Sequence, residues 1–498
     1  MSLGKKVFTS AFLLLFRKIW GNLINLLVMA FLARILSRED FGLLAISSVF
    51  LSIINTLATS GIAEYIVYYD GDDKQEKINA AFWLNLFLTL AVIAVVITAG
   101  PWWADFYKNE KIYSLLLLLS VSFFFEMGST VPRAMLRKEL EYKTLVYYSS
   151  VSMTVISVGK VAAAWAGFGV YSLALPQALV SPFLMLAFFL KTTWKPYARL
   201  GVAHFKTIVN YSKHIIGGRV LTKLVNEGDN LIVGKLIGME GLGIYALAFQ
   251  LANLVTTNVV FLVNDLVLPV FSKVKNDTVR LKNVYLHMLE LLGNVSFPLI
   301  VVLILSAESI INVIYGEKWI DAVLPFQILC AFALSRSINS PTSSLFNAMG
   351  RPDTNFKFAI YFTPVFLLSV YFGSLNGVVG VALATTICRI LGSFVLVGLA
   401  LKLIYAKWSE FFGALQYMAI ASMITFLMFS FLLLDLEIPY QDLIRLFIAP
   451  IILYFNILLY RLLFKQAMIR NLNYFFEING QRKITTFIRR FIFIYDKG

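Results

Sequence analysis

The stretch ARILSREDFGLLA, from Ala33 to Ala45, recurs in altered form as GKLIGMEGLGIYA, from Gly234 to Ala246, 201 residues later. In both stretches a basic residue precedes two aliphatic residues, and a glutamate, a glycine and an alanine occupy matching positions. Each stretch comes directly after a long apolar run. This match predicts a chain built from two halves that fold alike.

A second pair of stretches recurs in the same order. AMLRKELEYK, from Ala134 to Lys143, aligns with AMGRPDTNFK, from Ala348 to Lys357. Both begin Ala-Met-x-Arg and go on to an acid, an aromatic residue and a closing lysine. A weaker third pair is Gly169-Val170 with Gly380-Val381. One short match could arise by chance, but two in the same order at similar offsets indicate a duplication.

The composition places the chain in a membrane. Of its 498 residues 59% are hydrophobic and 14% are charged, and the mean hydropathy is +0.78. An ordinary soluble domain has about 25% charged residues. These values exclude a soluble enzyme, a disordered chain and a disulfide scaffold. Cys330 and Cys388 lie in apolar segments and the three histidines are widely spaced, so the sequence predicts neither a disulfide nor a metal site.

Apolar runs bounded by charged or turn residues predict an all-α polytopic membrane protein with about 14 transmembrane helices. The predicted spans are 8–33, 41–67, 79–100, 112–132, 144–166, 169–190, 209–236, 242–268, 284–306, 323–346, 355–374, 377–401, 410–434 and 441–464. With the repeat, they predict two pseudo-symmetric six-helix lobes, two extra helices and a tail. The predicted domains are 1–195 and 196–405 for the lobes, 406–464 for the extra helices and 465–498 for the basic tail.

The basic residues predict the orientation. With a cytoplasmic N-terminus, 28 lysines and arginines of the loops and tail face the cytoplasm, against 6 on the opposite side. This asymmetry follows the positive-inside rule, so we expect both termini to be cytoplasmic. The net charge of +15 then indicates contact with anionic lipid and no nucleic-acid partner. The longest loop, 191–206, is too short for a catalytic domain, which favours a transporter over an enzyme.

Both halves begin on the same side of the membrane, so the repeat is parallel. Two bundles related in this way favour alternating access around a central site. A channel or a membrane-embedded enzyme has less need of this symmetry. The sequence has no Walker pattern ending in Gly-Lys-Ser/Thr, which argues against an ATP site. No cofactor is predicted, and coupling to H⁺ or Na⁺ stays open.

Ionisable residues inside spans are costly and usually face a cavity. In the span 209–236, four polar residues fall within a stripe about 60° wide, and two acids flank it. In the first span, three polar residues form a similar stripe, which the 201-residue offset superposes on the other. The stripe of the span 209–236 consists of Arg219, Lys223, Asn226 and Asn230, and its flanking acids are Glu227 and Asp229. The stripe of the first span consists of Lys18, Asn22 and Asn25.

Two interpretations of these cations stay open. In the first they line a shared cavity, where lysine and arginine bind an anionic ligand and amides bind hydroxyl groups. In the second they form structural ion pairs with nearby acids. Those acids are Glu64, Glu227, Asp229 and Asp265. A cavity for cationic drugs would favour carboxylates, yet the first span contains no acid.

The tail has a helical pattern of its own. In ITTFIRRFIFIY, from Ile484 to Tyr495, the apolar residues fall on one face and both arginines lie away from its centre. This pattern is typical of an amphipathic helix on anionic lipid. A disordered basic tail is the alternative.

The chain resembles the bacterial polysaccharide transporters, or Wzx-type flippases, of the multidrug/oligosaccharidyl-lipid/polysaccharide exporter superfamily. The resemblance rests on RILSREDFGLLA after the first span, on the AMLRKELEYK loop and on GDNLIVGKLIGMEGLGIYALAFQLANL, from Gly228 to Leu254. It covers nearly the whole chain. The branch it resembles most exports colanic acid, teichuronic acid and succinoglycan-type polymers. These motifs are specific for the broad family and do not name a sugar.

The resemblance implies a flippase that carries undecaprenyl-diphosphate-linked oligosaccharide repeat units across the bacterial cytoplasmic (inner) membrane, for exopolysaccharide or lipopolysaccharide biosynthesis. It also implies two lobes around a basic central cavity. On this basis Lys18, Arg219 and Lys223 are expected to hold the diphosphate, with Lys160, Arg336 and Arg389 as further candidates. Asn22, Asn25, Asn226 and Asn230 are expected to contact sugar hydroxyls. Glu227, Asp229 and Asp265 are expected to tune the cations or to carry a coupling ion.

Three alternative functions stay open. A multidrug or cation antiporter of the same superfamily shares the fold, but the cationic stripes and the acid-free first span oppose it. A peptidoglycan-precursor flippase differs only in the head group that it carries. A membrane-embedded polymerase or ligase acting on the same lipid-linked glycan usually needs a large external loop, which this chain lacks. The expected partners are the lipid-linked oligosaccharide, membrane lipids, a polysaccharide polymerase and export machinery.

Overall fold

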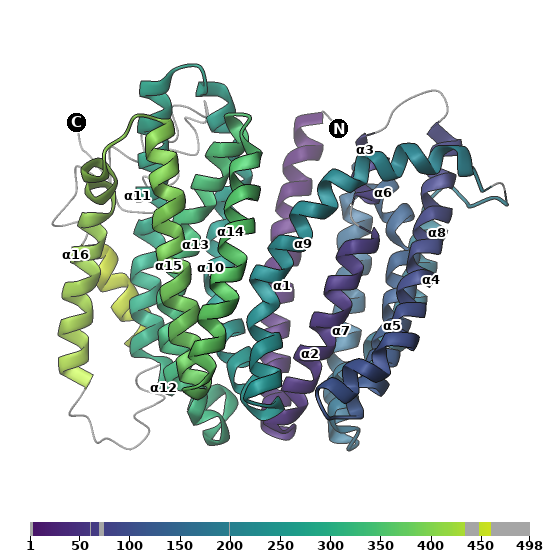
Figure 1. Cartoon of the computed structure of the whole chain (residues 1–498), viewed down its shortest axis with the longest axis horizontal. Helices are drawn as coiled ribbons and strands as arrows, with labels where there is room; N and C mark the ends of the chain where they lie inside the picture. The colour runs from purple at the N-terminus through teal and green to yellow at the C-terminus, as the bar shows by residue number, and fades with distance from the viewer. Residues whose placement is uncertain (1–2, 60, 69–73, 199, 434–447, 460–498) are drawn as a thin grey trace. The chain divides into compact units, whose positions relative to one another are not determined.

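The computed structural model describes residues 3–59, 61–68, 74–198, 200–433 and 448–459 (Figure 1). Within these ranges the chain forms helices and turns and no strand. Eleven of the described helices are long and apolar enough to cross a membrane. Helices suit this setting because each satisfies its own backbone hydrogen bonds in lipid. The predicted all-α polytopic membrane fold is confirmed.

Two compact units make up the chain, Met1–Ala246 and Leu247–Gly498. The helices of the first unit are α1 (Leu3–Ile35), α2 (Arg38–Thr59), α3 (Ile62–Tyr68), α4 (Lys74–Phe106), α5 (Lys111–Gly128), α6 (Thr130–Lys138), α7 (Tyr142–Trp165), η1 (Gly169–Leu173), α8 (Leu175–Lys191), η2 (Val202–His204) and α9 (Phe205–Leu236). Helix α10 (Met239–Val274) begins in the first unit and continues into the second.

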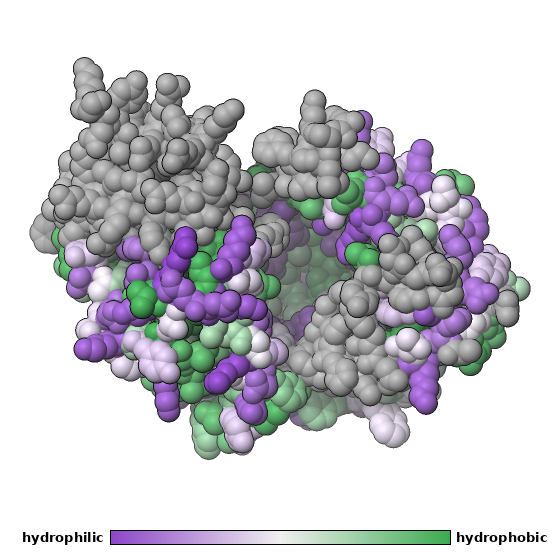
Figure 2. Space-filling model, turned by 90° about the horizontal axis from the view of Figure 1, so that it is seen from above, coloured by the Kyte–Doolittle hydropathy of each residue, from purple (hydrophilic) through white to green (hydrophobic). Residues whose placement is uncertain are grey.

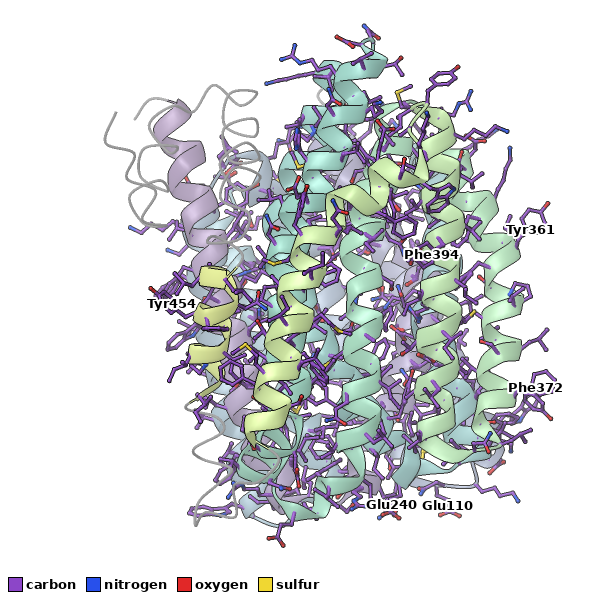
Figure 3. The ribbon with its side chains drawn as sticks, turned by 90° about the vertical axis from the view of Figure 1, so that its left-hand side faces the viewer. Glu110, Glu240, Tyr361, Phe372, Phe394 and Tyr454 are labelled. Carbon is purple, nitrogen blue, oxygen red and sulfur yellow. The ribbon has the colours of Figure 1, made fainter. Side chains whose placement is uncertain are left out.

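The second unit continues after α10 with a set of long helices and three short helical turns. They are α11 (Thr278–Leu305), α12 (Ala307–Ile310), η3 (Ile311–Tyr315), η4 (Glu317–Ala322), α13 (Val323–Ala348), α14 (Pro352–Ser374), α15 (Gly377–Leu403) and α16 (Trp408–Leu433). A further short apolar helix covers Ile448–Leu459. Figure 3 shows Tyr361 and Phe372 of α14 pointing outward from this unit, where they are exposed as lipid-facing residues of a membrane protein would be.

The predicted count of 14 spans stays a prediction. The predicted spans 209–236 and 242–268 are the continuous helices α9 and α10, which include residues whose side chains are not described. The last predicted span, 441–464, overlaps the helix Ile448–Leu459. The predicted amphipathic helix at 484–495 lies outside the described residues.

Two predicted spans are interrupted. The span 41–67 is divided into α2 and α3 around Gly61, whose φ of 97° breaks the helical path. The span 112–132 is divided into α5 and α6 at Ser129. Pro132 lies near the start of α6 and has no N–H to donate to the preceding turn, which explains the division.

In the first unit, an apolar cluster buries one face of the short helix α6. Val131 and Met135 of α6 pack with Tyr65 of α3, Ala81 of α4 and Trp194, which follows α8. This end of the unit is also where α1 begins, and hydrophilic side chains gather on it (Figures 1 and 2). The cluster fixes α6 and therefore the side chains on its other face.

The core of the second unit gathers residues of α10, α11, α13, α15 and α16. Its largest buried side chains are aromatic: Phe271, Tyr285, Phe346 and Phe411. The Tyr285 hydroxyl and the Thr342 hydroxyl lie 2.9 Å apart and satisfy one another inside this core. The packing makes these helices one body that carries the polar residues described below.

The predicted lobes 1–195 and 196–405 stay a prediction. The contacts group residues 196–246 with the first unit, because α9 packs on α2 and α4. Tyr107, which follows α4, donates its hydroxyl to the carbonyl of Leu231 in α9 at 3.2 Å. Burial raises the pKa of this hydroxyl, so it stays protonated as a donor.

Candidate functional site

The two copies of the repeated motif contact each other inside the first unit. A Cβ atom added to Gly42 of α2 would lie 1.9 Å from the carbonyl oxygen of Met239. One added to Gly243 of α10 would lie 1.9 Å from the carbonyl oxygen of Arg38. Two helix starts therefore cross backbone to backbone, which only glycine allows at both positions. The Arg38 Nη1 atom lies 3.2 Å from Glu240 Oε1 across the same crossing.

This crossing lies at the opposite end of the first unit from α6. Figure 3 shows Glu240 at the lower end, where Glu110 also lies. Asn109 donates from Nδ2 to Glu39 Oε1 at 2.9 Å, which ties the turn after α4 to the first copy of the motif. The two repeated stretches therefore form one polar, closely packed layer at that end of the unit.

The stripe of α9 contains an ion pair. Lys223 Nζ lies 2.7 Å from Glu227 Oε1, one turn along the helix, and Glu227 also accepts a hydrogen bond from the Ser52 hydroxyl of α2. Both charged side chains are partly buried, at 37% and 21% exposure. Lys223 therefore forms a structural ion pair, as the second of the two interpretations of these cations expects. Its positive charge is largely neutralised by Glu227.

Asp229 is the most deeply buried of the predicted acids. It is 0% exposed and accepts a hydrogen bond from the Tyr245 hydroxyl of α10 at 2.7 Å. Its carboxylate also accepts from the backbone N–H of Asn230 at 3.0 Å. The buried side-chain oxygen of Asn230 accepts no hydrogen bond from the described residues. Asn226 is partly buried on the same helix.

The stripe of α1 is partly buried along the whole of its length, at Lys18, Asn22 and Asn25. Helix α1 packs along α7, and the indole of Trp20 lies 3.4 Å from the hydroxyl of Thr154. Lys160 is also partly buried, near the end of α7. The side chains of the remaining two predicted site residues of the chain, Arg219 and Asp265, lie outside the described residues.

The second unit encloses two arginines. Arg389 of α15 is 8% exposed, and its guanidinium lies 4.6 Å from the ring centre of Phe366 and 4.8 Å from that of Phe332. A guanidinium over aromatic faces is held by cation–π attraction. Arg336 of α13 donates to the side-chain oxygen of Asn253 in α10. The charge of Arg389 acts on that of Arg336, so the two cations lie within electrostatic reach of each other.

A sequence family described as polysaccharide biosynthesis protein matches residues 31–324, which is more than half of the chain. The chain belongs to this family. Both copies of the repeated motif and most of the predicted site residues lie inside the matched region. The resemblance predicted from those motifs is thereby confirmed.

Two curated relatives agree with the family. Over 377 residues this chain is 25% identical to the lipopolysaccharide biosynthesis protein WzxC of Escherichia coli (strain K12). The match covers 74% of this chain and 76% of the relative. The chain is 22% identical over 351 residues to the succinoglycan biosynthesis transport protein ExoT of Rhizobium meliloti (strain 1021), covering 70% of each. The prediction of a membrane transporter of polysaccharide biosynthesis, and not an enzyme, is confirmed.

A solved structure supports the fold. The lipid II flippase MurJ in an inward closed conformation superposes with a TM-score of 0.71 at 18% identity, over 92% of this chain and 99% of that one. At this identity the likeness shows the fold. The roles of single side chains stay predictions.

One group of charged residues in the first unit was missed by the sequence analysis. Arg133 and Arg137 follow the predicted span 112–132 and are therefore assigned to a loop, and Arg17 is not one of the predicted stripe residues Lys18, Asn22 and Asn25. In the structure Arg133 Nη1 lies 3.8 Å from Glu126 Oε1, and the charges of Arg17 and Arg137 also act on Arg133. The AMLRKELEYK repeat, which contains Arg137, was the sequence signal that pointed to this segment.

Proposed function

We propose that the chain is a flippase that translocates undecaprenyl-diphosphate-linked oligosaccharide repeat units from the cytoplasmic to the outer leaflet, for exopolysaccharide or lipopolysaccharide biosynthesis. The family match supports the pathway. The names of the two relatives, which refer to lipopolysaccharide biosynthesis and to succinoglycan transport, support an exported glycan. The transported head group is then a diphosphate joined to a short chain of sugars.

The observation that carries this proposal is the pair of arginines in the second unit. Arg389 is almost wholly buried in a membrane-spanning helix, among aromatic rings, and the charge of Arg336 is close by. Two guanidinium groups in a low-dielectric region raise each other's energy, and an anion offsets that cost. Guanidinium groups bind phosphate through two parallel hydrogen bonds. A diphosphate is therefore the ligand that best matches this pair.

In the first unit, the expected contacts divide by chemistry. Lys18 and Arg219, with Lys160, would contribute positive charge toward the diphosphate, while Lys223 would do so only when its pair with Glu227 opens. The amides of Asn22, Asn25, Asn226 and Asn230 would hydrogen-bond sugar hydroxyls. The buried side-chain oxygen of Asn230 accepts no hydrogen bond from the part of the chain that the structure describes, which supports this role, since such an acceptor favours a ligand that brings a donor.

The acids have a different role in this proposal. Glu227 lowers the local positive charge through its pair with Lys223, and Asp229 binds the hydroxyl of Tyr245. A carboxylate buried this deeply can carry a proton, so Asp229 is the first candidate for coupling to H⁺, with Asp265 as the second. Coupling to Na⁺ is the alternative, and the same carboxylates would supply its oxygen ligands.

The proposed location is the bacterial cytoplasmic (inner) membrane, with both termini in the cytoplasm and transport by alternating access around a cationic central cavity. The excess of basic residues in the predicted cytoplasmic loops supports this orientation. In that orientation the crossing of Gly42 and Gly243 lies at the outer end of the first unit. A polysaccharide polymerase and the export machinery are the proposed partners that receive the product.

The test is depletion of the protein in its native host, followed by extraction of diphosphate-linked oligosaccharide and measurement of its amount in each leaflet. We expect the oligosaccharide to accumulate in the inner leaflet. Wild type should restore transport, whereas the Arg336→Gln and Arg389→Gln variants should not, and Arg280→Gln, at an exposed site, serves as the control. Arg219→Ala tests the corresponding prediction in the first unit.

Two other results would point to the alternative functions. Intact surface polysaccharide without accumulation would reject the flippase and favour a multidrug or cation antiporter. Accumulation of a peptidoglycan precursor in place of a polysaccharide unit would favour the peptidoglycan-precursor flippase.

A further inference from the structure

Three arginines of the first unit lie within electrostatic reach of one another, and one of them, Arg133, pairs with a carboxylate. Arg17 belongs to α1, Arg133 and Arg137 to α6, and Glu126 to the last turn of α5. The distance from Arg133 Nη1 to Glu126 Oε1 is 3.8 Å, and the charges of both other arginines act on Arg133. We call these four residues the α6 arginine cluster. Its net charge is +2, since one carboxylate offsets one of three guanidinium groups.

The fold places two of these arginines on one face of α6 and packs the side chain of one of them, Arg133. Helix α6 buries Val131 and Met135 in the apolar cluster of the first unit, so Arg133 and Arg137, one turn apart, share the opposite face. The guanidinium of Arg133 lies 5.8 Å from the ring centre of the buried Phe188. Its side chain is only 26% exposed. The charge of Arg133 is therefore positioned by packed helices, and Arg137 lies exposed one turn further along the same face.

The cluster lies near the predicted cytoplasmic edge of the membrane. Helix α6 is at the end of the unit where α1 begins (Figure 1). Helix α1 runs from Leu3 to Ile35, so Arg17 lies about four turns after its first residue. At 1.5 Å per residue, Arg17 is about 27 Å from Ile35, close to the thickness of a hydrocarbon core. Arg133 and Arg137 directly follow the predicted span 112–132, so a group bound to them would lie at the predicted cytoplasmic end of that span.

We propose that the α6 arginine cluster binds the phosphate groups of a lipid and receives the diphosphate of the transported lipid at the cytoplasmic face. Guanidinium groups bind phosphate in two-pronged pairs, and a net charge of +2 matches a diphosphate. Like charges held this close favour an anion that neutralises them. This inference rests on the proposed function. An ordinary anionic phospholipid carries the same phosphate chemistry, so the experiment separates the two sources.

The experiment measures lipid binding by the purified full-length chain, using native mass spectrometry. The probes are undecaprenyl diphosphate, phosphatidylglycerol and the zwitterionic phosphatidylcholine as reference. The first variant replaces all three arginines, by Arg17→Gln, Arg133→Gln and Arg137→Gln. The second is Glu126→Gln, which removes the only carboxylate of the cluster and raises its net charge. Arg280→Gln, at an exposed position of the second unit, is the matched control.

We expect the triple variant to bind undecaprenyl diphosphate about tenfold more weakly than wild type. Glu126→Gln should bind it several-fold more tightly. If the Arg133–Glu126 pair were purely structural, its loss would weaken binding or leave binding unchanged. The control should match wild type. A loss confined to undecaprenyl diphosphate identifies the carrier diphosphate as the ligand, and an equal loss for phosphatidylglycerol identifies lipid phosphate in general.

Either of two results would overturn the inference. If wild type binds undecaprenyl diphosphate and the triple variant binds it equally well, the cluster is not the site, while the proposed function is unaffected. Glu126→Gln keeps all three arginines and removes the one negative charge of the cluster. If this variant folds normally and shows no gain in affinity for undecaprenyl diphosphate, the argument from net charge fails. If wild type binds no undecaprenyl diphosphate, both the inference and the proposed function fail.

Discussion

Arg389 shows how much a single side chain depends on its surroundings. Its guanidinium lies 4.8 Å, 4.6 Å and 5.9 Å from the ring centres of Phe332, Phe366 and Phe249. These rings come from three different helices, α10, α13 and α14. A planar guanidinium stacks on such rings and still presents its edge to a phosphate, whereas a lysine ammonium is a point charge.

Arg389→Lys should therefore keep the fold and lose transport. We expect the rate of lipid-linked oligosaccharide translocation in proteoliposomes to fall by about tenfold, because the charge remains while the stacked, two-pronged geometry is lost. Arg280→Lys should leave the rate unchanged. Wild-type transport by Arg389→Lys would show that only the charge matters at this position.

Tyr245 tests the buried carboxylate of Asp229 in the same way. Tyr245→Phe removes the hydroxyl that donates to Asp229 and keeps the ring, which is fully buried. Removing a donor from a buried charged acceptor costs about 1–3 kcal/mol. The midpoint of thermal unfolding should fall by several degrees. Tyr405→Phe, at a residue 84% exposed, should leave it unchanged. Equal midpoints for both variants would contradict this role.

Part of the candidate site could be predicted from the sequence. The pair Lys223–Glu227 follows from helical spacing, because residues four apart on a helix are neighbours. The rings around Arg389 could not be predicted, since they depend on how α10, α13 and α14 pack against α15. The partners of Arg133 were missed for a related reason: residues 133–138 follow the predicted span 112–132 and are assigned to a loop, whereas tertiary packing buries the apolar face of α6.

At the scale of elements, the repeated sequence motif marks the place where α2 and α10 contact each other. The matching glycines Gly42 and Gly243 were only a sequence pattern, yet each lies against the backbone of the other copy. The limits of several helices were less predictable. An apolar run from 41 to 67 gives no hydropathy signal at Gly61, where the backbone φ of 97° separates α2 from α3.

Gly42→Ala and Gly243→Ala should each separate the two helix starts. The new methyl group would clash with a backbone carbonyl, which cannot rotate away as a side chain can. Overpacking of this kind costs about 1–3 kcal/mol, so we expect a lower unfolding midpoint and reduced polysaccharide export. Gly413→Ala is the matched control, because a Cβ atom there would contact nothing within 4 Å. Normal export by both motif variants would show that the close crossing is dispensable.

At the scale of the whole molecule, orientation is the property on which the proposed transport direction depends. The basic residues of the loops predict this orientation. In the first unit, different polar groups lie at the two ends. Glu110 and the Arg38–Glu240 pair lie at one end of that unit, and α6 lies at the other. The chain offers a favourable background for a labelling test, since its two cysteines, Cys330 and Cys388, are both buried.

Single cysteines at exposed positions should therefore report the side on which each position lies. Glu110→Cys and Glu317→Cys should react with a membrane-impermeant maleimide added outside intact cells. Lys143→Cys and Arg280→Cys should react only after the membrane is opened, because the positive-inside rule assigns their loops to the cytoplasm. Wild type gives the background from the buried cysteines. The reverse pattern would invert the molecule, place the α6 arginine cluster at the outer face and turn it from a site of substrate uptake into one of release.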